Sequence, residues 1–535
     1  MGFTFRGFEM HGWRMWQRAR IEQALAFIRA HGMTALVLHE PDIMHQLVFP
    51  RAFFDPYAQW KGAPTRRGEN AIHNNRAYFE HVMYLAANQG TELWLEVKEL
   101  AFPDEVLQAR PELVKAGVVC PSEPFWRDFI TAKTEELLAD FPLLAGLILS
   151  PGSPEGRASR VQAKCGCALC AATPLVDWYC GIIEAMHAPL AARGKRLAVR
   201  DFAYQPADHA PLIEAVGRQP RDVIFCVKTT PHDFYPTFPD NPAFGRLPDR
   251  PQWVEYDVQG QYYGWGVFPC LMFDDIRRRL VHARAKGCEG GLFRSEWERI
   301  NDLAVLDGPN APNMVAAAML SLGPAGDEAI AAAWLRSCGF PEGAAPWLAD
   351  VGARTWPILR DTLYIDDFVF SDSSMFPRNI GRAWWTMEEK HALVPWSVAH
   401  AGRLDLDAPR IAALLAQKEA AITAAHALVA FLDLPHAGVP ADLLALWRQS
   451  AAPLPLYAEG MRLCAEVCLR ARWQERDAAN ADTAAFAAAI ERLAAFADRL
   501  RPLATEARHP HQVVMLLDAH RADDIVAEAR GMLGR

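Results

Sequence analysis

The residues best equipped for chemistry lie in one stretch, between Asp222 and Trp265. Lys228 and Asp233 follow a short apolar run, VIFCV, which has the composition of a buried strand. A second run, WVEYDVQ, carries three polar residues at every other position, namely Glu255, Asp257 and Gln259. Alternate residues of a strand point to the same side, so these three share one face. Polar groups at the carboxyl ends of buried strands build the active site of a (β/α)8 barrel. The alternative is that they satisfy only one another beneath loops.

A further carboxylate, Glu155, follows an apolar run in the segment SPGSPEGR, where glycine and proline favour a tight loop. A partly shielded carboxyl group in such a loop can keep its proton and act as a general acid. Asp233 is its natural counterpart. Two carboxyl groups that face each other across a barrel mouth are the minimum equipment of a glycosidase, and their separation distinguishes inversion from retention. We therefore predict Glu155 and Asp233 as the catalytic pair.

Two cations, Arg200 and Lys228, end strands that follow one another in the chain. Cations at neighbouring strand ends can clamp the carboxylate of a substrate, and arginine can bind it through two hydrogen bonds. The same cations could instead pair with Asp201, Asp233 or Glu255. Residue types alone leave both arrangements open.

Other strand ends also carry polar residues that could contact a substrate or form internal ion pairs. These lesser candidates are Glu9 and His11, His39 and Glu40, Glu96 and Lys98, and Arg294 and Glu296.

Cys165, Cys167 and Cys170 form a C-x-C-x-x-C motif just after the SPGSPEGR loop. Three thiolates this close can bind zinc, and Cys120 or Cys180 would complete a tetrahedral site. The motif is not the paired C-x-x-C arrangement, so reduced thiols packed beside a loop are the alternative. A zinc ion here would be structural and would fix the loop of the general acid. We expect no cofactor to be required for catalysis.

The scaffold for these residues is predicted from the pattern of residues 3 to about 322, where short apolar strands alternate with amphipathic helices. We expect strands in FTFRGFEM, TALVLHE, TELWLEVKEL, LAGLILS, KRLAVRDFAY, DVIFCVKTT, WVEYDVQ and GGLFRSE. Helices are expected over 13–30, 70–88, 125–139, 176–192, from about 210, and over 274–286. Eight such units predict a (β/α)8 TIM barrel of the α/β class over residues 1–325.

The remainder of the chain, residues 326–535, is rich in alanine and leucine and predicts an all-α C-terminal domain. Its expected helices cover 408–429, 440–448, 455–472 and 483–503. The segment 365–396 is instead interpreted as a polar and aromatic loop. It either caps the barrel mouth, which we favour, or forms a subunit contact. We also expect a homodimer formed through the helical domain.

Composition excludes several classes of protein. The chain has 535 residues, 51% of them hydrophobic, which suffices for two or three domains. A net charge of −9 argues against nucleic-acid binding. No apolar run is long enough to span a membrane, and the N-terminus lacks the pattern of a signal peptide. Eleven cysteines in so long a chain do not indicate a disulfide scaffold. We expect a cytoplasmic protein whose partner is an oligosaccharide.

The stretch CVKTTPHDFYPTFPDNPAFGRLPDRPQWVEYDVQGQYYG resembles the α-glucuronidases of bacterial and fungal glycoside hydrolases. Their pattern runs K-N-G-P-x-D-F-Q-x-R-E-P-x-x-P-L-F-G and then M-E-F-Q-x-x-Q-E-Y. The residues that fall on it with the same spacing are Lys228, Pro231, Asp233, Phe234, Pro242, Phe244, Gly245, Glu255 and Tyr262. Residues 153–156 resemble the family's S-E-G motif, and residues 199–204 its W-R-A-F-x-Y motif. The likeness spans residues 140–330 by motif and 1–535 by architecture.

The resemblance implies removal of α-1,2-linked glucuronic acid, often 4-O-methylated, from xylan fragments. It makes Glu155 the general acid and Asp233 the base that activates water in an inverting reaction, with Arg200 and Lys228 holding the uronate carboxylate. The remaining residues assigned to substrate binding are Glu255, Asp257, Gln261 and Tyr262.

Three departures from the family pattern favour a different sugar or a different glucuronoside. Gln261 replaces a glutamate that is a second candidate base, and an amide takes no proton at neutral pH, so Asp233 serves alone or Asp257 helps. A lysine that precedes the family's general acid has no match here. We also expect a divergent relative without the family's N-terminal β domain, since the barrel begins at residue 3.

We therefore predict an exo-acting, inverting glycoside hydrolase, similar to α-glucuronidases, that removes a uronic acid or related sugar from an oligosaccharide. One alternative is a metal-dependent sugar isomerase or lyase with ligands His39, Glu40, Glu96, Asp257 and Glu296. The other is a non-catalytic carbohydrate-binding relative, which is motivated by Gln261.

Overall fold

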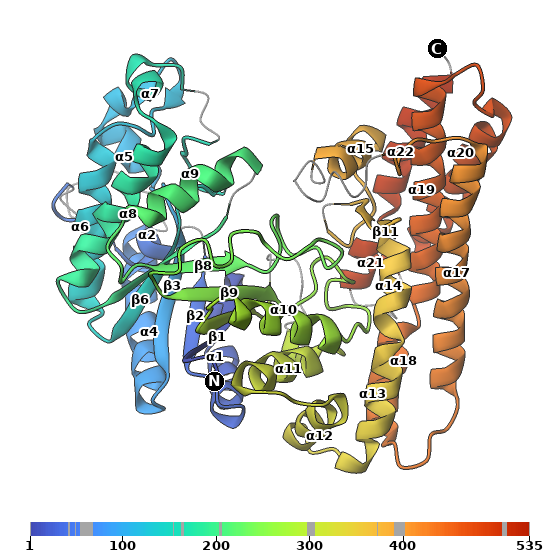
Figure 1. Ribbon diagram of the computed structural model, residues 1–535, viewed down its shortest axis with the longest axis horizontal. Coiled ribbons are helices and arrows are strands. Elements are labelled where there is room, and N and C mark those ends of the chain that lie inside the picture. The colour runs from blue at the N-terminus through green and yellow to red at the C-terminus, as the bar shows by residue number, and fades with distance from the viewer. Residues whose placement is uncertain are drawn as a thin grey trace.

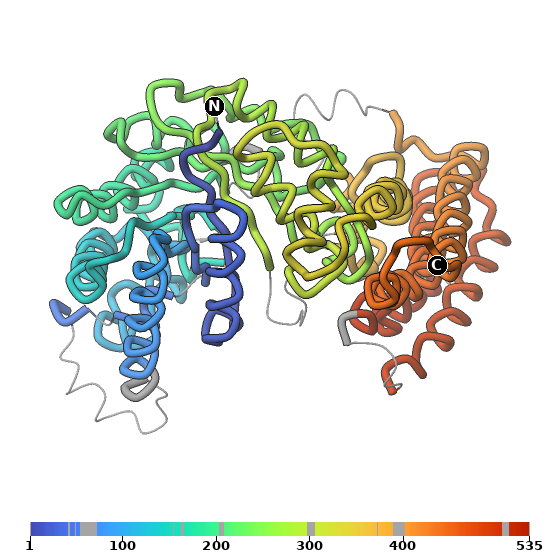
Figure 2. Tube along the Cα trace, turned by 90° about the horizontal axis from the view of Figure 1, so that it is seen from below, coloured from blue at the N-terminus to red at the C-terminus, as the bar shows by residue number. Residues whose placement is uncertain are grey.

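The computed structural model describes most of the chain. The described residues are 2–40, 43–48, 50–53, 68–153, 155–161, 165–202, 206–296, 305–371, 373–389, 402–505 and 511–533. Within them no helix is both long and apolar enough to cross a membrane. Figures 1 and 2 show a barrel and a group of long helices that lie side by side.

Eight parallel strands close into a barrel in the order β1-β10-β9-β8-β7-β6-β3-β2, which confirms the predicted (β/α)8 fold. The strands are β1 (Phe5–His11), β2 (Ala35–His39), β3 (Glu92–Lys98), β6 (Leu144–Ser150), β7 (Arg196–Arg200), β8 (Ile224–Lys228), β9 (Gln252–Asp257) and β10 (Gly290–Arg294). Each was expected from an apolar run. Their carboxyl ends therefore share one rim of the barrel.

Helices surround the barrel (Figure 1). The longer ones are α1 (Arg18–Ala30), α4 (Gly68–Asn88), α6 (Phe125–Asp140), α8 (Leu175–Ala191), α9 (Pro206–Gly217), α10 (Phe273–Ala285) and α11 (Ala311–Leu322). Short elements lie between them, namely the 3-10 turns η1 (Gly12–Trp16), η2 (Pro111–Leu113) and η3 (Val305–Asp307) and the helices α2 (Ile43–Leu47), α5 (Asp104–Ala109) and α7 (Ala168–Ala172). The predicted helix over 13–30 is thus wrong at its start, because η1 precedes α1. A hairpin of β4 (Val114–Lys115) and β5 (Val118–Val119) was not predicted.

The interior of the barrel has an aromatic floor. Phe5 stacks on Trp253 with ring centroids 3.7 Å apart, and Trp94 meets the same indole edge-on at 5.2 Å. These residues and the small residues between them form a core separate from the one under the helices. Residues two positions further along the same strands point inward above this floor, because side chains alternate along a strand.

The chain beyond α11 is helical, as predicted for the C-terminal part. Its helices are α12 (Asp327–Ser337), α13 (Ala345–Ala353), α14 (Thr355–Leu363), α15 (Ile380–Glu389), α17 (Ala408–Asp433), α18 (Ala441–Ala451), α19 (Leu454–Arg476), α20 (Thr483–Leu500), α21 (His511–Leu516) and α22 (Ala519–Leu533), with 3-10 turns η4 (Glu342–Ala344) and η5 (Arg501–Thr505). The predicted loop over 365–396 is wrong in part. It contains one strand of the hairpin β11 (Tyr364–Ile365) and β12 (Phe368–Val369) and the helix α15, and residues 390–396 lie outside the described residues.

The helical part is fastened to the loop that follows β9. Ser374 donates from its backbone and from its hydroxyl to the carbonyl of Gln261, at 2.9 and 2.8 Å. The Tyr364 hydroxyl donates to the carbonyl of Tyr262 at 2.8 Å. Tyr457 of α19 in turn donates to the carbonyl of Ser374. The described part of the 365–396 segment therefore packs on the loop after β9 through Ser374.

Gly146 of β6 has no room for a side chain. A Cβ atom there would lie 2.3 Å from the Arg196 carbonyl oxygen and 2.5 Å from the Trp94 ring. Because backbone and a packed indole would both have to shift, we expect Gly146→Ala to lower the free energy of unfolding by about 1–3 kcal/mol. Gly343→Ala is the control, since no atom lies within 4 Å of its Cβ position. Equal thermal midpoints for the two variants would contradict this account.

Candidate active site

A layer of charged side chains lies above the aromatic floor, at the carboxyl ends of the strands. Its members are Glu9, His39, Glu96, Arg200, Glu255 and Arg294, each at most 3% exposed. Lys98 and Lys228, at the last positions of β3 and β8, are equally buried. Burial of so many charges is tolerated only where each is paired or hydrogen-bonded.

Arg200 is the centre of this layer. Its guanidinium binds Glu255 through two contacts, one of them Nε to Oε2 at 2.6 Å, and its Nη1 lies 3.1 Å from Oε1 of Glu96. Burial opposes ionisation of Glu255, but Arg200 outweighs it and holds the pKa of Glu255 below its usual value. Of the two arrangements left open by the sequence, the structure has the ion pairs.

The carboxylates of Glu9 and Glu96 flank His39. Oε1 of Glu9 lies 2.7 Å from Nδ1 of His39, and Oε1 of Glu96 lies 3.3 Å from its Nε2. Burial, followed by the charges of Glu96 and Glu255, raises the pKa of Glu9 well above its usual value. Burial, followed by the charge of Lys98, lowers the pKa of His39 well below its own. These shifts favour the protonated form of Glu9 and the neutral form of His39.

This trio is one of the groups whose donor atoms lie close enough to hold a metal ion. The ligand set expected for a metal-dependent enzyme does not assemble around it, however. Glu40 accepts hydrogen bonds from Trp16 and Gln46, at 3.4 and 3.0 Å. Glu296 pairs with Arg14 at 2.7 Å. Arg200 and the trio instead form one hydrogen-bonded ion network.

Each of the two predicted catalytic carboxylates is paired with a buried lysine. Glu155, which follows β6, pairs with Lys98. Asp233, which follows β8, has Oδ1 3.2 Å from Nζ of Lys228 and Oδ2 3.2 Å from Nδ1 of His232. The lysines are fully buried, whereas the side chains of Glu155 and Asp233 are 34% and 19% exposed. Both carboxylates therefore lie where buried charge meets solvent.

The two lysines titrate differently. Burial, and then the charge of Arg200, lowers the pKa of Lys98 well below its usual value. Burial lowers the pKa of Lys228 only to about 8, because Asp233 opposes the shift. At neutral pH Lys228 thus remains charged, while the charge on Lys98 is disfavoured.

Two phenylalanines complete the site. The ring of Phe202 lies 3.9 Å from Nζ of Lys228, 5.7 Å from Nζ of Lys98 and 5.2 Å from the guanidinium of Arg200. Phe234 lies under Lys228 and Arg294, at 4.8 and 4.5 Å. Aromatic faces stabilise cations without neutralising them. In the sequence both residues were recognised only as positions of the family motif.

The loop after β9 is held by its own polar groups. The amide of Gln261 donates to Oδ2 of Asp257 at 3.0 Å, and Arg294 donates to Oε1 of Gln261 at 3.2 Å. Nε of Arg294 also approaches Oδ1 of Asp257, at 3.4 Å. The ring of Tyr262 packs on Tyr235, with centroids 4.3 Å apart. Asp257, a predicted substrate contact, thus has a clear role in positioning Gln261.

The backbone of Asp233 adopts an unusual conformation. Its φ of 45° lies in the left-handed region, which disfavours residues other than glycine. The hydroxyl of Thr230 donates to its carbonyl at 2.5 Å. Strained backbone of this kind persists only where the surroundings enforce it, and it concentrates at functional sites.

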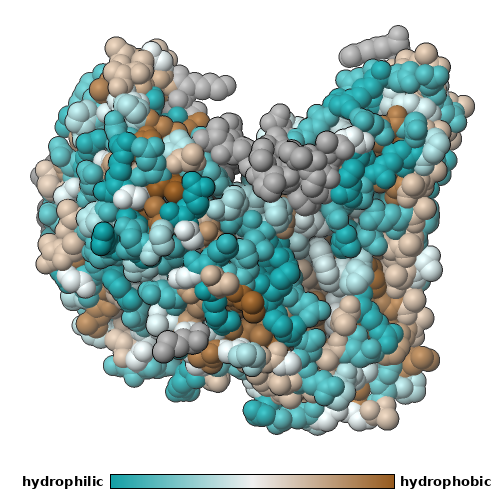
Figure 3. Space-filling model, viewed as in Figure 1, coloured by the Kyte–Doolittle hydropathy of each residue, from teal (hydrophilic) through white to brown (hydrophobic). Residues whose placement is uncertain are grey.

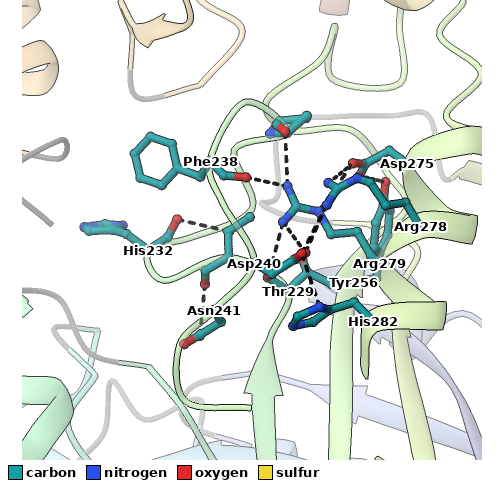
Figure 4. Close-up of polar contacts among 12 residues, drawn as sticks. Thr229, His232, Phe238, Asp240, Asn241, Tyr256, Asp275, Arg278, Arg279 and His282 are labelled. Carbon is teal, nitrogen blue, oxygen red and sulfur yellow. Dashed lines mark hydrogen bonds and ion pairs between the residues drawn. The ribbon is translucent and has the colours of Figure 1, made fainter. Parts of the chain in front are cut away.

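Arg279 of α10 enforces the shape of this loop (Figure 4). Its buried guanidinium donates to the carbonyls of Pro236 and Phe238, at 3.1 and 2.7 Å, and pairs with Asp240 at 2.9 Å. At the other end of the loop it reaches the carbonyl of Thr229 at 3.4 Å. No sequence pattern indicated this role, because an arginine on an amphipathic helix is expected to face solvent.

Comparisons of the whole chain bear on the fold. The structure is similar to a family 138 glycoside hydrolase that targets pectin rhamnogalacturonan II, at TM-score 0.62 and 12% identity, over 100% of this chain and 67% of that one. The chain has the fold of a glycoside hydrolase. No protein-family model matches the sequence, and no curated protein does.

More distant structural similarities are to other glycoside hydrolases. One is the O-GlcNAc hydrolase of Thermobaculum terrenum, at TM-score 0.44 and 10% identity, covering 99% of this chain and 94% of that one. Another is a family 115 4-O-methyl-α-glucuronidase with specificity for decorated arabinogalactans, at 0.45 and 13%, covering 99% and 61%.

The cysteines of the C-x-C-x-x-C motif also come together in the structure. Cys165, Cys167 and Cys170 form one group with Cys120. The other candidate for the fourth position, Cys180, instead directs its thiol toward the Ala215 carbonyl, at 3.7 Å.

Arg279 offers a test of the positioning of Asp233. We expect Arg279→Met to lower kcat about 10- to 100-fold, because a catalytic group displaced by about 1 Å loses that much. Arg278→Met is the matched control, since the neighbouring Arg278 is half exposed and pairs with Asp240 and Asp275. The rates should be measured well below the unfolding temperature of each variant. An unchanged kcat in Arg279→Met would show that the loop holds its shape without this residue.

Proposed function

We propose that the protein is an inverting glycoside hydrolase that removes a uronic acid, or a related anionic sugar, from an oligosaccharide. The observation that carries the proposal is the pairing of two partly exposed carboxylates, Glu155 and Asp233, with two buried lysines of different pKa. Environments that drive two titratable groups toward opposite protonation states are the mark of an acid and base pair.

The general acid would be Glu155. Because burial lowers the pKa of Lys98, a full positive charge beside Glu155 is disfavoured, and Lys98 opposes protonation of this carboxyl group less than a charged lysine would. Glu155 would pass its proton to the glycosidic oxygen as the bond to the anomeric carbon breaks. The sugar departs with its anomeric carbon bearing developing positive charge, and the aglycone leaves as the neutral alcohol.

The base would be Asp233. Lys228 remains charged at neutral pH and favours the ionised form of this carboxylate, which is the form that a base needs. Asp233 would take a proton from a water molecule as that water attacks the anomeric carbon from the face opposite the leaving group. Asp257 and Arg294 hold Gln261 at the same rim. Its amide would orient polar groups there through hydrogen bonds, without accepting a proton.

The cations around Phe202 support a preference for an anionic sugar. Lys98, Arg200 and Lys228 all lie within 6 Å of this one ring. Because the contacts of Arg200 are taken by Glu255 and Glu96, we assign the carboxylate contact to Lys228 rather than to the pair Arg200 and Lys228 expected from the sequence. The resemblance to α-glucuronidases supports the same substrate class.

The rest of the oligosaccharide has a suitable place beside the barrel. A cavity of about 330 Å³ lies where Gln261 meets the helical part, and its walls include Arg378, Arg382 and Arg521. Figure 3 shows the surface hollowed between the barrel and the long helices, with mainly hydrophilic described walls. We infer that an acidic glycan extends from the barrel mouth toward these arginines.

The acid and base roles predict different responses to the leaving group. We expect Asp233→Asn to lower kcat about 10²- to 10⁴-fold on every substrate, because the attacking water loses its base. Glu155→Gln should lose as much on an oligosaccharide but far less on an aryl uronoside, whose phenolate leaves without a proton. Glu112→Gln, an exposed carboxylate on η2, is the control. Retention of anomeric configuration, followed by NMR, would overturn the mechanism, as would full activity in Asp233→Asn.

The pKa of Lys228 predicts that the basic limb of the pH dependence of kcat/KM differs between substrates. Its ammonium is charged below its pKa of about 8 and neutral above it. We therefore expect kcat/KM for a uronoside to fall about tenfold per pH unit above about pH 8, while the methyl ester of the same uronoside shows no such fall. Lys228→Arg keeps its charge at high pH and should abolish the limb. The same limb on both substrates would assign Lys228 to positioning Asp233 alone.

The metal-dependent alternative rests on the trio of Glu9, His39 and Glu96. Turnover that is lost on chelation and restored by a divalent ion would favour it over hydrolysis. Tight sugar binding without turnover on any glycoside would instead favour the non-catalytic alternative.

A further inference from the structure

Four cysteine side chains gather where the insertion after β3 meets the loop after β6. Cys120 follows β5, while Cys165, Cys167 and Cys170 lie at the start of α7. All four Sγ atoms lie within 4.8 Å of one another. Sγ of Cys120 is 3.5 Å from Sγ of both Cys167 and Cys170.

These distances fit one metal ion in a tetrahedron of sulfurs. A zinc ion with Zn–S bonds of about 2.3 Å places its ligands about 3.8 Å apart. Contacts of 3.5 Å are also much longer than the ~2.05 Å of a disulfide, so the thiols are side by side rather than bonded.

The elements that carry the thiols are too short, and the apolar cluster around them too small, to be stable without a cross-link. Among the described residues, the local apolar cluster consists of Cys120, Cys165 and Cys170, with Val118 and Cys167 packed on it, and it is separate from the main core. The strands β4 and β5 have two residues each, and α7 has five. Elements this short do not form alone.

The protein backbone holds the ligands in place. The amide of Cys120 donates to the Leu113 carbonyl at 2.8 Å, which closes the hairpin, and Trp126 donates to the Cys120 carbonyl at 2.8 Å. The amide of Cys170 points at Sγ of Cys167, at 3.4 Å. Amide donors directed at sulfur stabilise the thiolate form that binds metal.

We propose that Cys120, Cys165, Cys167 and Cys170 bind one structural zinc ion. Four thiolates leave no coordination position for water or substrate, so the ion would be structural rather than catalytic. It would join the insertion after β3 to the loop after β6, which are 47 residues apart at Cys120 and Cys167. The same loop carries Glu155 ten residues before Cys165. The site stands independently of the proposed reaction.

The experiment uses the full chain, expressed in minimal medium with added zinc and dialysed against a weak chelator. We expect about one zinc per chain by mass spectrometry and about four sulfur neighbours near 2.3 Å in zinc-edge X-ray absorption. Less than a tenth of an equivalent of zinc, or stoichiometric iron in its place, would overturn the proposal. This measurement needs no variant and does not depend on activity.

Variants then assign the ligands. Cys120→Ser and Cys170→Ser should each reduce the bound zinc at least tenfold. Cys180→Ser, a buried thiol on α8 outside the group, should keep one equivalent. Removal of zinc from the native protein should raise hydrogen exchange in residues 113–122 and 165–173 while the barrel strands stay protected. Unchanged exchange there, or equal zinc in all three variants, would show that these thiols are not the ligands.

Discussion

The cost of burying charge governs this active site. Arg200 has no exposed surface, and an unpaired guanidinium in such a place would be prohibitively unstable. Glu255 and Glu96 supply its counter-charges from strands on either side, so one cation unites β7 with β9 and β3. The other charged residues of the layer are arranged around Arg200 and these two glutamates. Burial and two neighbouring carboxylates raise the pKa of Glu9, and burial lowers the pKa of His39, which lies between Glu9 and Glu96.

The same cost of burying charge makes the environments of the two carboxylates at the rim different. Glu155 and Asp233 are both partly exposed, and each pairs with a lysine that is almost completely buried. The two carboxylates differ in their lysine partners. The pKa of Lys98 lies well below its usual value, whereas the pKa of Lys228 is lowered only to about 8. Two equally buried lysines thus differ in pKa because of the charges beside them, Arg200 for Lys98 and Asp233 for Lys228. Neither Glu155 nor Asp233 needs to be buried itself.

Much of the fold was predictable from the sequence, because each strand is a short apolar run with period-two polar residues. Glu255 and Asp257 share an inward face as their spacing required. The partner of Arg200 was not predictable, since Glu255 and Glu96 lie 55 and 104 residues away and meet it only when the barrel closes. Cys165, Cys167 and Cys170 were apparent as a motif, but the choice of Cys120 over Cys180 depends on the hairpin of β4 and β5. Arg279 was missed because its partners are backbone carbonyls, which no side-chain pattern reveals.

The attachment of the helical part to the loop after β9 has a consequence for synthesis on the ribosome. Every barrel strand has been made once Arg294 is joined, yet the contact between Tyr457 and Ser374 that braces Gln261 needs a much longer chain. At about 5–20 residues per second, translation takes about 10–30 s to cover the interval. The barrel therefore emerges and can close well before its mouth is complete. A nascent chain would pass through a stage in which the scaffold is folded and the rim still waits for residues yet to be translated.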